Sequence, residues 1–228
     1  RRSDVKPEDC ILYSGAANGA EAQFGAAAER YGIDEVNFTF EGHNDARRRG
    51  IRVLTHEELE HGDVSLSYVS KLMHRAYPDT PLFKRVLQTI YFQVNHGQEI
   101  YVVGKILTDQ TVKGGTGWGA EFAKLCNKPL FVFDQDRDGW FQWSGESFEP
   151  AKDPVIRHPH FCGTGTRFLS ENGALAIDAR ETRKVTAMRV FCREDARVDM
   201  NQSSGASTNC ALALVTVFAG YRACFARL

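Results

Sequence analysis

A glycine-rich stretch between two apolar segments constrains the fold of this chain more than any other feature. Residues 99–104 (EIYVVG) and 130–133 (LFVF) are short apolar runs, typical of buried parallel strands. Between them lies KGGTGWGAE at 113–121, followed by an amphipathic segment that reaches Leu125. A strand, a glycine loop, a helix and a second strand in this order make a parallel βαβ unit.

The glycines of this loop, at positions 114, 115, 117 and 119, leave its backbone bare. A ligand can approach the N–H groups of such a loop, and the start of the following helix adds partial positive charge. Anionic groups, above all phosphate, suit this place. A tight turn without any ligand would use the same glycines, so both interpretations stay open at this point.

The first forty residues repeat the pattern. Residues 10–13 are a short apolar strand, residues 20–31 carry apolar side chains at helical spacing, and residues 36–40 alternate as a strand does. The turn SGAANGAE at 14–21 is a second candidate for an anion-binding loop. Small residues there also serve to pack a helix against a strand, and this alternative stays open.

A third strand with a glycine turn lies late in the chain, FCGTGTR at 161–167, and a helix is expected over 170–182. Further helices are expected over 56–76, with a break near Gly62, and over 82–94. Strands therefore alternate with helices along most of the chain. This favours an α/β fold that is Rossmann-like, a mostly parallel sheet with helices on both faces.

Composition changes towards the C-terminus. Residues 149–159 are polar and contain prolines, which indicates a linker, and residues 183–228 mix basic side chains with Ser, Thr and Asn. Residues 211–228 are apolar but interrupted by glycine and arginine, so they lack the span that a membrane helix needs. We predict one domain over residues 1–182 and a C-terminal appendage of unknown role over residues 183–228.

The net charge and the cysteines limit the classes of partner and the cellular compartment that we expect. The net charge of −1 gives no global drive towards nucleic acid or membrane, and the basic run at 47–49 is interpreted as solvated surface. Six cysteines without a CxxC pair indicate free thiols and a cytoplasmic protein, although the absence of an initial Met leaves a lost leader open. Asp134, Asp136 and Asp138 are not followed by the glycine and glutamate of a calcium loop, so we do not interpret them as a calcium site. We expect neither a metal nor a cofactor.

Three motifs carry a resemblance to a known superfamily. GGTGWGAE at 114–121 resembles the GGxGTxxE signature of the LOG and lysine decarboxylase-like phosphoribohydrolases. SGAANGAE at 14–21 is similar to the SGGAxGAD turn of DprA/Smf proteins, and CGTGTR at 162–167 to the GSR turn that opens their Rossmann domain. Together they point to the SLOG superfamily. In DprA-like proteins the GSR turn comes first, whereas here it comes last, which indicates a circularly permuted domain.

The resemblance implies a nucleotide or nucleotide-derived small molecule held by two loops at the carboxyl ends of adjacent strands. It implies hydrolysis of the N-glycosidic bond of a nucleoside monophosphate, with Glu121 on the position of the catalytic acid. Its nearest counterpart to the family's helix arginine is Arg85, one turn before the matching Thr89. The residues that it places at the ligand are Ser14, Gly15, Ala16, Asn18, Gly19, Glu21, Gly114, Gly115, Thr116, Gly117, Trp118, Thr164 and Arg167.

Several departures keep the function open. Trp118 replaces the family's threonine and either stacks on a base or packs in the core, and Ala16 replaces a glycine. Thr89 stands where the hydrolases have arginine, which weakens the hydrolase interpretation more than it weakens nucleotide binding. The alternatives are a non-catalytic nucleotide sensor or carrier and, with less support, a DprA-like DNA-processing protein. A homodimer is a further open expectation.

Overall fold

The computed structural model of this protein describes residues 5–152 and 154–178. The chain divides into two units, Arg1–Cys192 and Arg193–Leu228, and the second unit lies wholly outside the described residues. The expected appendage at 183–228 therefore lies outside them too, as does the end of the helix expected over 170–182.

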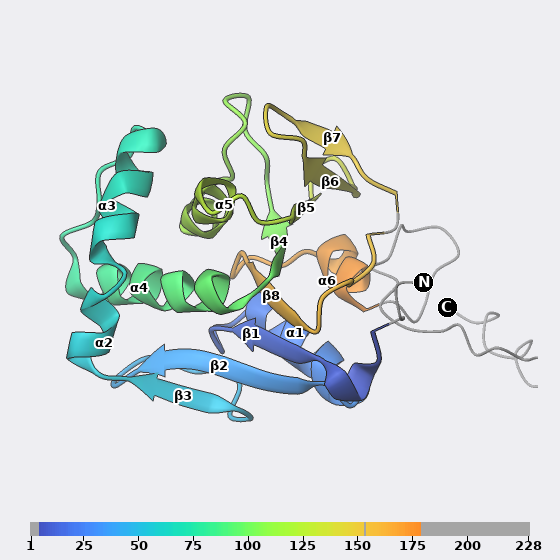
Figure 1. The fold of residues 1–228 in the computed structure, drawn as a ribbon, viewed down its shortest axis with the longest axis horizontal. Helices are drawn as coiled ribbons and strands as arrows, with labels where there is room; N and C mark the ends of the chain where they lie inside the picture. Colours follow the sequence, from blue (N-terminus) through green and yellow to red (C-terminus); the bar gives the residue numbers. More distant parts are fainter. Residues whose placement is uncertain (1–4, 153, 179–228) are drawn as a thin grey trace, which may run out of the picture. The chain divides into compact units, whose positions relative to one another are not determined.

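The centre of the described unit is one eight-stranded sheet, in the order β3-β2-β1-β8-β4-β5-β6-β7 (Figure 1). The first six strands in this order are parallel, and the last two pair antiparallel. The α/β, mostly parallel fold expected from the sequence is therefore confirmed. The strands are β1 (Ile11–Ser14), β2 (Asp34–Phe40), β3 (Ile51–Leu54), β4 (Glu99–Gly104), β5 (Leu130–Asp134), β6 (Gly139–Trp143), β7 (Phe148–Pro150) and β8 (His160–Gly165).

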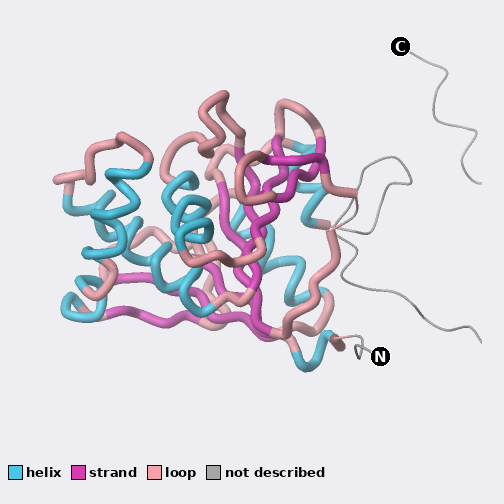
Figure 2. Tube along the Cα trace, turned by 45° about the horizontal axis from the view of Figure 1, so that its top comes forward, coloured by secondary structure: helices cyan, strands magenta, loops and turns pink. Residues whose placement is uncertain are grey.

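Helices cover both faces of this sheet, as Figure 2 shows for the cyan coils around the magenta strands. One face carries α4 (Pro81–His96) over β2, β1 and β8, and α5 (Thr116–Leu125) over β8, β4 and β5. The other face carries α1 (Ala20–Arg30) and α6 (Glu171–Ile177). The shorter α2 (His56–Glu60) and α3 (Asp63–Leu72) pack on α4, and a 3₁₀ turn covers Pro7–Asp9.

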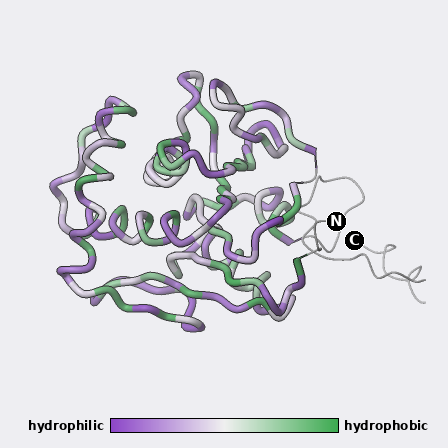
Figure 3. Tube along the Cα trace, in the orientation of Figure 1, coloured by the Kyte–Doolittle hydropathy of each residue, from purple (hydrophilic) through white to green (hydrophobic). Residues whose placement is uncertain are grey.

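The side chains of β4 show how the sheet separates two cores. Alternate residues of a strand point to opposite faces. Ile100 and Val102 therefore lie in the cluster under α4 and α5, whereas Tyr101 and Val103 lie in the cluster under α1 and α6. All four are fully buried, which explains the continuous apolar run in the sequence. The covering helix α4 instead alternates hydrophobic and hydrophilic turns (Figure 3).

β8, the last of the described strands in the sequence, lies in the middle of the sheet. β8 lies between β1 and β4, pairing Tyr13 with Cys162 on one side and Ile100 with Cys162 on the other. The expectation that residues near Phe161 share a sheet with residues 10–13 is confirmed. Parallel strands far apart in sequence have become direct neighbours in the middle of the sheet.

Some local expectations need correction. Residues 51–54 were not expected as a strand, yet they form the edge strand β3, and the expected linker at 149–159 begins within β7. α5 starts at Thr116, inside the glycine stretch, rather than after it. No helix among the residues with a described structure is long and apolar enough to cross a membrane.

Candidate functional site at the carboxyl ends of the central strands

The three glycine-containing turns meet at one edge of the sheet. They follow β1, β8 and β4, which are neighbours, and the carboxyl ends of parallel strands share an edge. One correction concerns the two loops expected on adjacent strands. β1 and β4 are not adjacent, because β8 and its own turn at 165–167 lie between them.

The glycine loop before α5 contains backbone N–H groups that have no hydrogen-bond acceptor among the described residues. The N–H groups of Gly117 and Trp118 bond back to the carbonyls of Gly114 and Gly115, at 3.2 and 3.0 Å. Within the described part of the chain, the N–H groups of Gly115 and Thr116 have no acceptor. They stand at the positive end of a ten-residue helix, where an anion is favoured.

Arg75, on the segment after α3, holds this loop by hydrogen bonds. Its guanidinium donates to the carbonyl of Val112 at 3.0 Å, to the carbonyl of Gly114 at 3.5 Å, and to the hydroxyl of Thr111 at 2.7 Å. These three hydrogen bonds tie the loop to Arg75. Its positive charge also adds to the local attraction for an anion.

The glycines of this loop serve different purposes. Gly114 adopts a φ of +73° and has open space where a side chain would stand. A Cβ at Gly115 would lie 3.3 Å from the ring of Phe83 on α4, and one at Gly117 would lie 2.1 Å from the carbonyl oxygen of Val112. Gly117 is therefore required by loop packing, and Gly114 is the glycine that faces free space.

The loop after β1 does not offer free N–H groups in the same way. The N–H of Ala16 donates to Asn37 Oδ1 at 3.2 Å, that of Ala17 to Glu21 Oε2 at 3.1 Å, and that of Gly19 to Asn18 Oδ1 at 2.9 Å. Side-chain oxygens of the protein therefore occupy the positions that phosphate oxygens would take. This loop is a poor phosphate site in the described conformation.

Ser14 and Ala16 are also built into the fold. The hydroxyl of buried Ser14 donates to the carbonyl of Gly163 at 2.7 Å. Ala16 is fully buried with a φ of +57°, in the left-handed region that glycine adopts most readily. The position where the resembling motif has glycine is thus a position where the backbone favours glycine.

Glu21 is a carboxyl buried at the start of α1. Its two oxygens accept from the N–H of Ala17 at 3.1 Å and from the hydroxyl of Thr164 at 2.8 Å, which joins the turns after β1 and β8. Burial raises the pKa of Glu21, while Thr164, Ala17, the Gln93 amide and the charge of His43 act in the opposite direction.

Gln93 of α4 completes this buried cluster from the other face of the sheet. Its side chain is fully buried, and neither of its amide atoms has a hydrogen-bond partner of normal geometry. A Cβ at Gly15 would lie 2.3 Å from Gln93 Nε2 and 2.5 Å from Glu21 Oε2, so only glycine fits between them. Buried polar atoms without a well-formed hydrogen bond are costly and rare, so Gln93 needs an explanation.

The loop after β2 brings polar side chains to the same edge. His43 Nδ1 lies 2.6 Å from Asp45 Oδ1, and the hydroxyl of Thr39 donates to the same oxygen at 2.6 Å. The backbone N–H groups of Ala46 and Arg47 donate to the carbonyl of Ala16, at 2.8 and 3.3 Å, so this loop is tied to the loop after β1.

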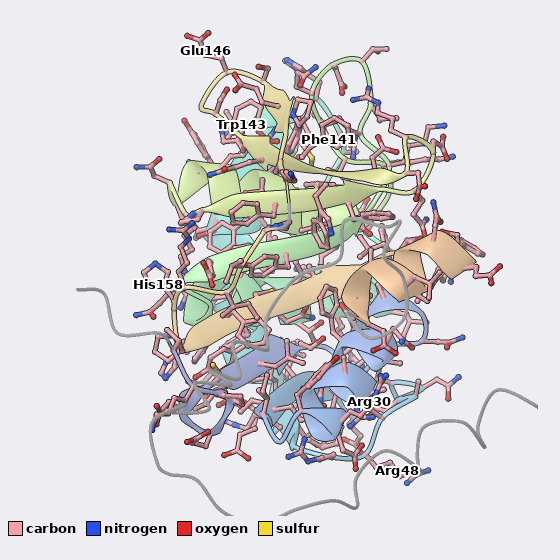
Figure 4. The ribbon with its side chains drawn as sticks, turned by 90° about the vertical axis from the view of Figure 1, so that its right-hand side faces the viewer. Arg30, Arg48, Phe141, Trp143, Glu146 and His158 are labelled. Carbon is pink, nitrogen blue, oxygen red and sulfur yellow. The ribbon has the colours of Figure 1, made fainter. Side chains whose placement is uncertain are left out.

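The basic run in this loop is not the solvated surface expected from the sequence. Glu35, whose side chain is fully buried, pairs with both Arg47 and Arg49. Arg47 is only 12% exposed in its side chain, because a buried carboxylate needs a partner. Arg49 keeps 37% of its side chain exposed, and Arg48 is exposed on the side of the molecule that Figure 4 shows.

Glu121 and Trp118 point elsewhere. The carboxylate of Glu121 pairs with Lys124 at 3.1 Å, and Lys124 also donates to the carbonyl of Gln110 and lies 3.9 Å from the ring centre of Trp143. These partners belong to the 105–113 loop and the β6–β7 hairpin, where Figure 4 labels Trp143. Trp118 is 3% exposed and packs on Tyr77 in the core, so its ring is not available to a base.

The remaining expected residues lie at or near the edge. Arg85 of α4 lies over the ring of Phe40, 5.9 Å from its centre, at the end of β2. Arg167 lies in the turn after β8, where its backbone packs against Gly19, and Asn18 is exposed. Thr164 lies between α1 and α5. Its hydroxyl donates to Glu21 of α1, and its methyl group lies beside Gly119 of α5, 3.8 Å from where a Cβ would stand.

Four residues of this site were missed by sequence reasoning, namely Arg75, Gln93, His43 and Asp45. Gln93 carried a detectable signal, because a polar side chain on the apolar face of an amphipathic helix asks for an explanation. The other three follow elements without any motif, and only the folded chain brings them to the glycine turns. The described residues contain no group of three or more side chains suited to hold a metal ion.

Comparison of the chain with models of protein families, with curated proteins and with solved structures gives no significant match.

Proposed function

We propose that this protein binds a nucleoside monophosphate or a closely related phosphorylated molecule at the carboxyl ends of β4, β8 and β1. The observation that carries the proposal is the start of α5. There, the partner-free N–H groups of Gly115 and Thr116 stand beside the unobstructed Gly114, in a loop that Arg75 holds by its carbonyls. This combination binds phosphate in many α/β proteins.

The rest of the ligand would extend over β8 and β1. Those strand ends carry polar groups, Thr164 and the buried pair of Glu21 and Gln93, rather than a purely apolar surface. In open α/β sheets, ligands bind outside the carboxyl ends of the strands, at the switch in strand order. The resemblance to SLOG proteins, which concerns the same turns, supports this proposal.

Whether the bound nucleotide is cleaved separates two candidate functions, a hydrolase and a sensor or carrier. A hydrolase needs a carboxylate at the ribose, and the resemblance assigns this role to Glu121. In the structure, Glu121 pairs with Lys124, which also donates to the carbonyl of Gln110. A carboxylate engaged in this way favours instead a sensor or carrier that binds without cleavage. Glu121→Gln separates them, because a hydrolase should lose about 100-fold in turnover while its affinity hardly changes.

The binding test uses two variants of one residue. Gly114 is exposed, has free space around it and has the backbone conformation that Asn and Asp tolerate. Gly114→Asp places a negative charge at the phosphate position, and Gly114→Asn places a neutral group of the same shape there. We expect the Asp variant to bind nucleoside monophosphates at least tenfold more weakly than the Asn variant, as measured by titration calorimetry.

The control ligand is the matching nucleoside without phosphate, for which the two variants should not differ. Gly115 is a poorer choice, because a side chain there would press on Phe83. If the wild-type protein binds none of the common monophosphates at millimolar concentration, or if both variants bind them equally, the phosphate site is wrong. Release of free base in the same samples then distinguishes a hydrolase from a sensor.

A further inference from the structure

The cluster of Thr39, His43 and Asp45 has no role in the proposed phosphate site. Asp45 Oδ1 accepts a hydrogen bond from the Thr39 hydroxyl at 2.6 Å and lies 2.6 Å from His43 Nδ1. The side chain of His43 is only 13% exposed, and its ring packs against that of Phe40 at a tilt of 46°, with 4.9 Å between the ring centres. The ring is therefore held in one orientation by packing and by hydrogen bonds.

These contacts decide which ring nitrogen carries the proton. An ionised carboxylate only accepts hydrogen bonds, so His43 Nδ1 has to donate to Asp45. In a neutral imidazole the other nitrogen, Nε2, is then an acceptor. Among the described residues Nε2 has no hydrogen-bond partner. The protein thus presents a fixed acceptor atom at this position.

His43 lies beside the rest of the site. When its ring is protonated, its charge acts on Glu21 of α1, and its loop is bonded to the carbonyl of Ala16. The groups that face it are Asp45 and Thr39 from its own side, Glu21 from α1, and the Phe40 ring, over which Arg85 of α4 lies. β2, which precedes His43, is three strands away from β4 in the sheet.

Three strand spacings of about 4.8 Å make about 14 Å between the ends of β4 and β2. A nucleotide whose phosphate lies at the start of α5 spans β8 and β1 with its sugar and reaches the end of β2 with its base. We infer that His43 Nε2 accepts a hydrogen bond from the base. It thereby selects bases with an amino group, adenine or cytosine, over the keto bases hypoxanthine or uracil. This inference rests on the proposed function.

The chemical reason is the direction of the hydrogen bond. An exocyclic amino group donates to the Nε2 acceptor, whereas a keto oxygen at the same position brings two acceptors together and leaves both unpaired. We expect wild-type protein at pH 8.5 to bind AMP about tenfold more tightly than IMP, and CMP about tenfold more tightly than UMP, by titration calorimetry. A single buried hydrogen bond accounts for a ratio of this size.

Two variants test the role of His43. His43→Phe keeps a ring against Phe40 but removes the acceptor, so both ratios should fall below about twofold. Asp45→Asn keeps the imidazole but no longer fixes its proton on Nδ1, so the ratios should shrink or reverse. His56→Phe is the control, because that side chain is 80% exposed on α2 and should leave both ratios unchanged. Circular dichroism establishes that each variant is folded, and Asp45→Asn remains decisive if His43→Phe does not fold.

Equal binding of amino and keto monophosphates by the wild type overturns this inference and leaves the proposed function intact. Retention of the tenfold ratios in a folded His43→Phe or Asp45→Asn variant also overturns it. Failure of the wild type to bind any of the four monophosphates refutes the proposed function, and this inference falls with it.

Discussion

Glu21 shows at the scale of one residue how the fold sets the ionisation of a group. Burial raises its pKa above the ordinary 4.5, despite hydrogen bonds from Thr164 and Ala17. The folded protein therefore holds the proton more tightly than the unfolded chain. The stability that follows is fully present below pH 4.5 and is lost as the pH rises through the raised folded value.

We predict that Glu21→Gln removes this loss, because an amide does not ionise. In urea titrations, the free energy of unfolding of the variant relative to wild type should increase as the pH rises above 4.5 and should level off above the raised folded pKa. The control is Glu29→Gln, on the surface beside Arg47, where hydrogen bonding to Arg47 lowers the pKa. The contribution of Glu29 therefore changes only below pH 4.5, and the difference of this variant from wild type should stay flat between pH 4.5 and 8. Parallel pH profiles of wild type and Glu21→Gln would contradict the prediction.

At the scale of one element, α4 depends on a lysine outside it. Lys128, in the loop before β5, donates to the carbonyls of Val94, Asn95 and Gly97, at 2.7, 2.8 and 2.7 Å. These are the carbonyls at the helix C-terminus that no N–H of the helix can satisfy, and a cation there also suits the helix dipole. Burial lowers the pKa of Lys128, so its charge is retained at some cost.

We predict that Lys128→Met destabilises the protein by about 2 kcal/mol, because three charge-assisted hydrogen bonds are lost at a partly buried position. Urea unfolding followed by circular dichroism measures this. Lys6→Met serves as the control, since its side chain is 70% exposed and pairs only with exposed Glu8 at 3.8 Å. A loss no larger than that of the control would show that water replaces the lysine.

At the scale of the whole sheet, β8 is the strand that joins two halves. One half is β3-β2-β1, and the other is β4 with the strands beyond it, and the two have no direct strand pairing. We predict that a chain ending at Pro150 does not unfold cooperatively in urea, because β1 and β4 would be left with unpaired edges. The full chain carrying both Phe161→Asp and Cys162→Asp should behave the same way, since both residues are buried. A sharp unfolding transition in either chain would contradict this.

The sequence by itself determined the local elements and the class of the fold. Apolar runs of the right length located β4 and β5, and helical spacing located α1 and α4, because buried faces leave a periodic trace in the chain. Thr55 and Glu58 have the spacing of a capping box in the sequence, and the structure shows this box with both hydrogen bonds. Edge strand β3 left no such trace, since its burial pattern does not alternate.

Only the tertiary structure decided which polar groups meet. Glu21 and Glu121 both follow a glycine turn and look alike in the sequence. Packing buries Glu21 against Thr164, 143 residues away, and leaves Glu121 paired with Lys124. His43 and Arg75 join the site through contacts between elements that no local pattern encodes. The physical reason is that hydrophobic spacing is read along one element, whereas a site is assembled from single side chains that several elements bring to one edge of the sheet.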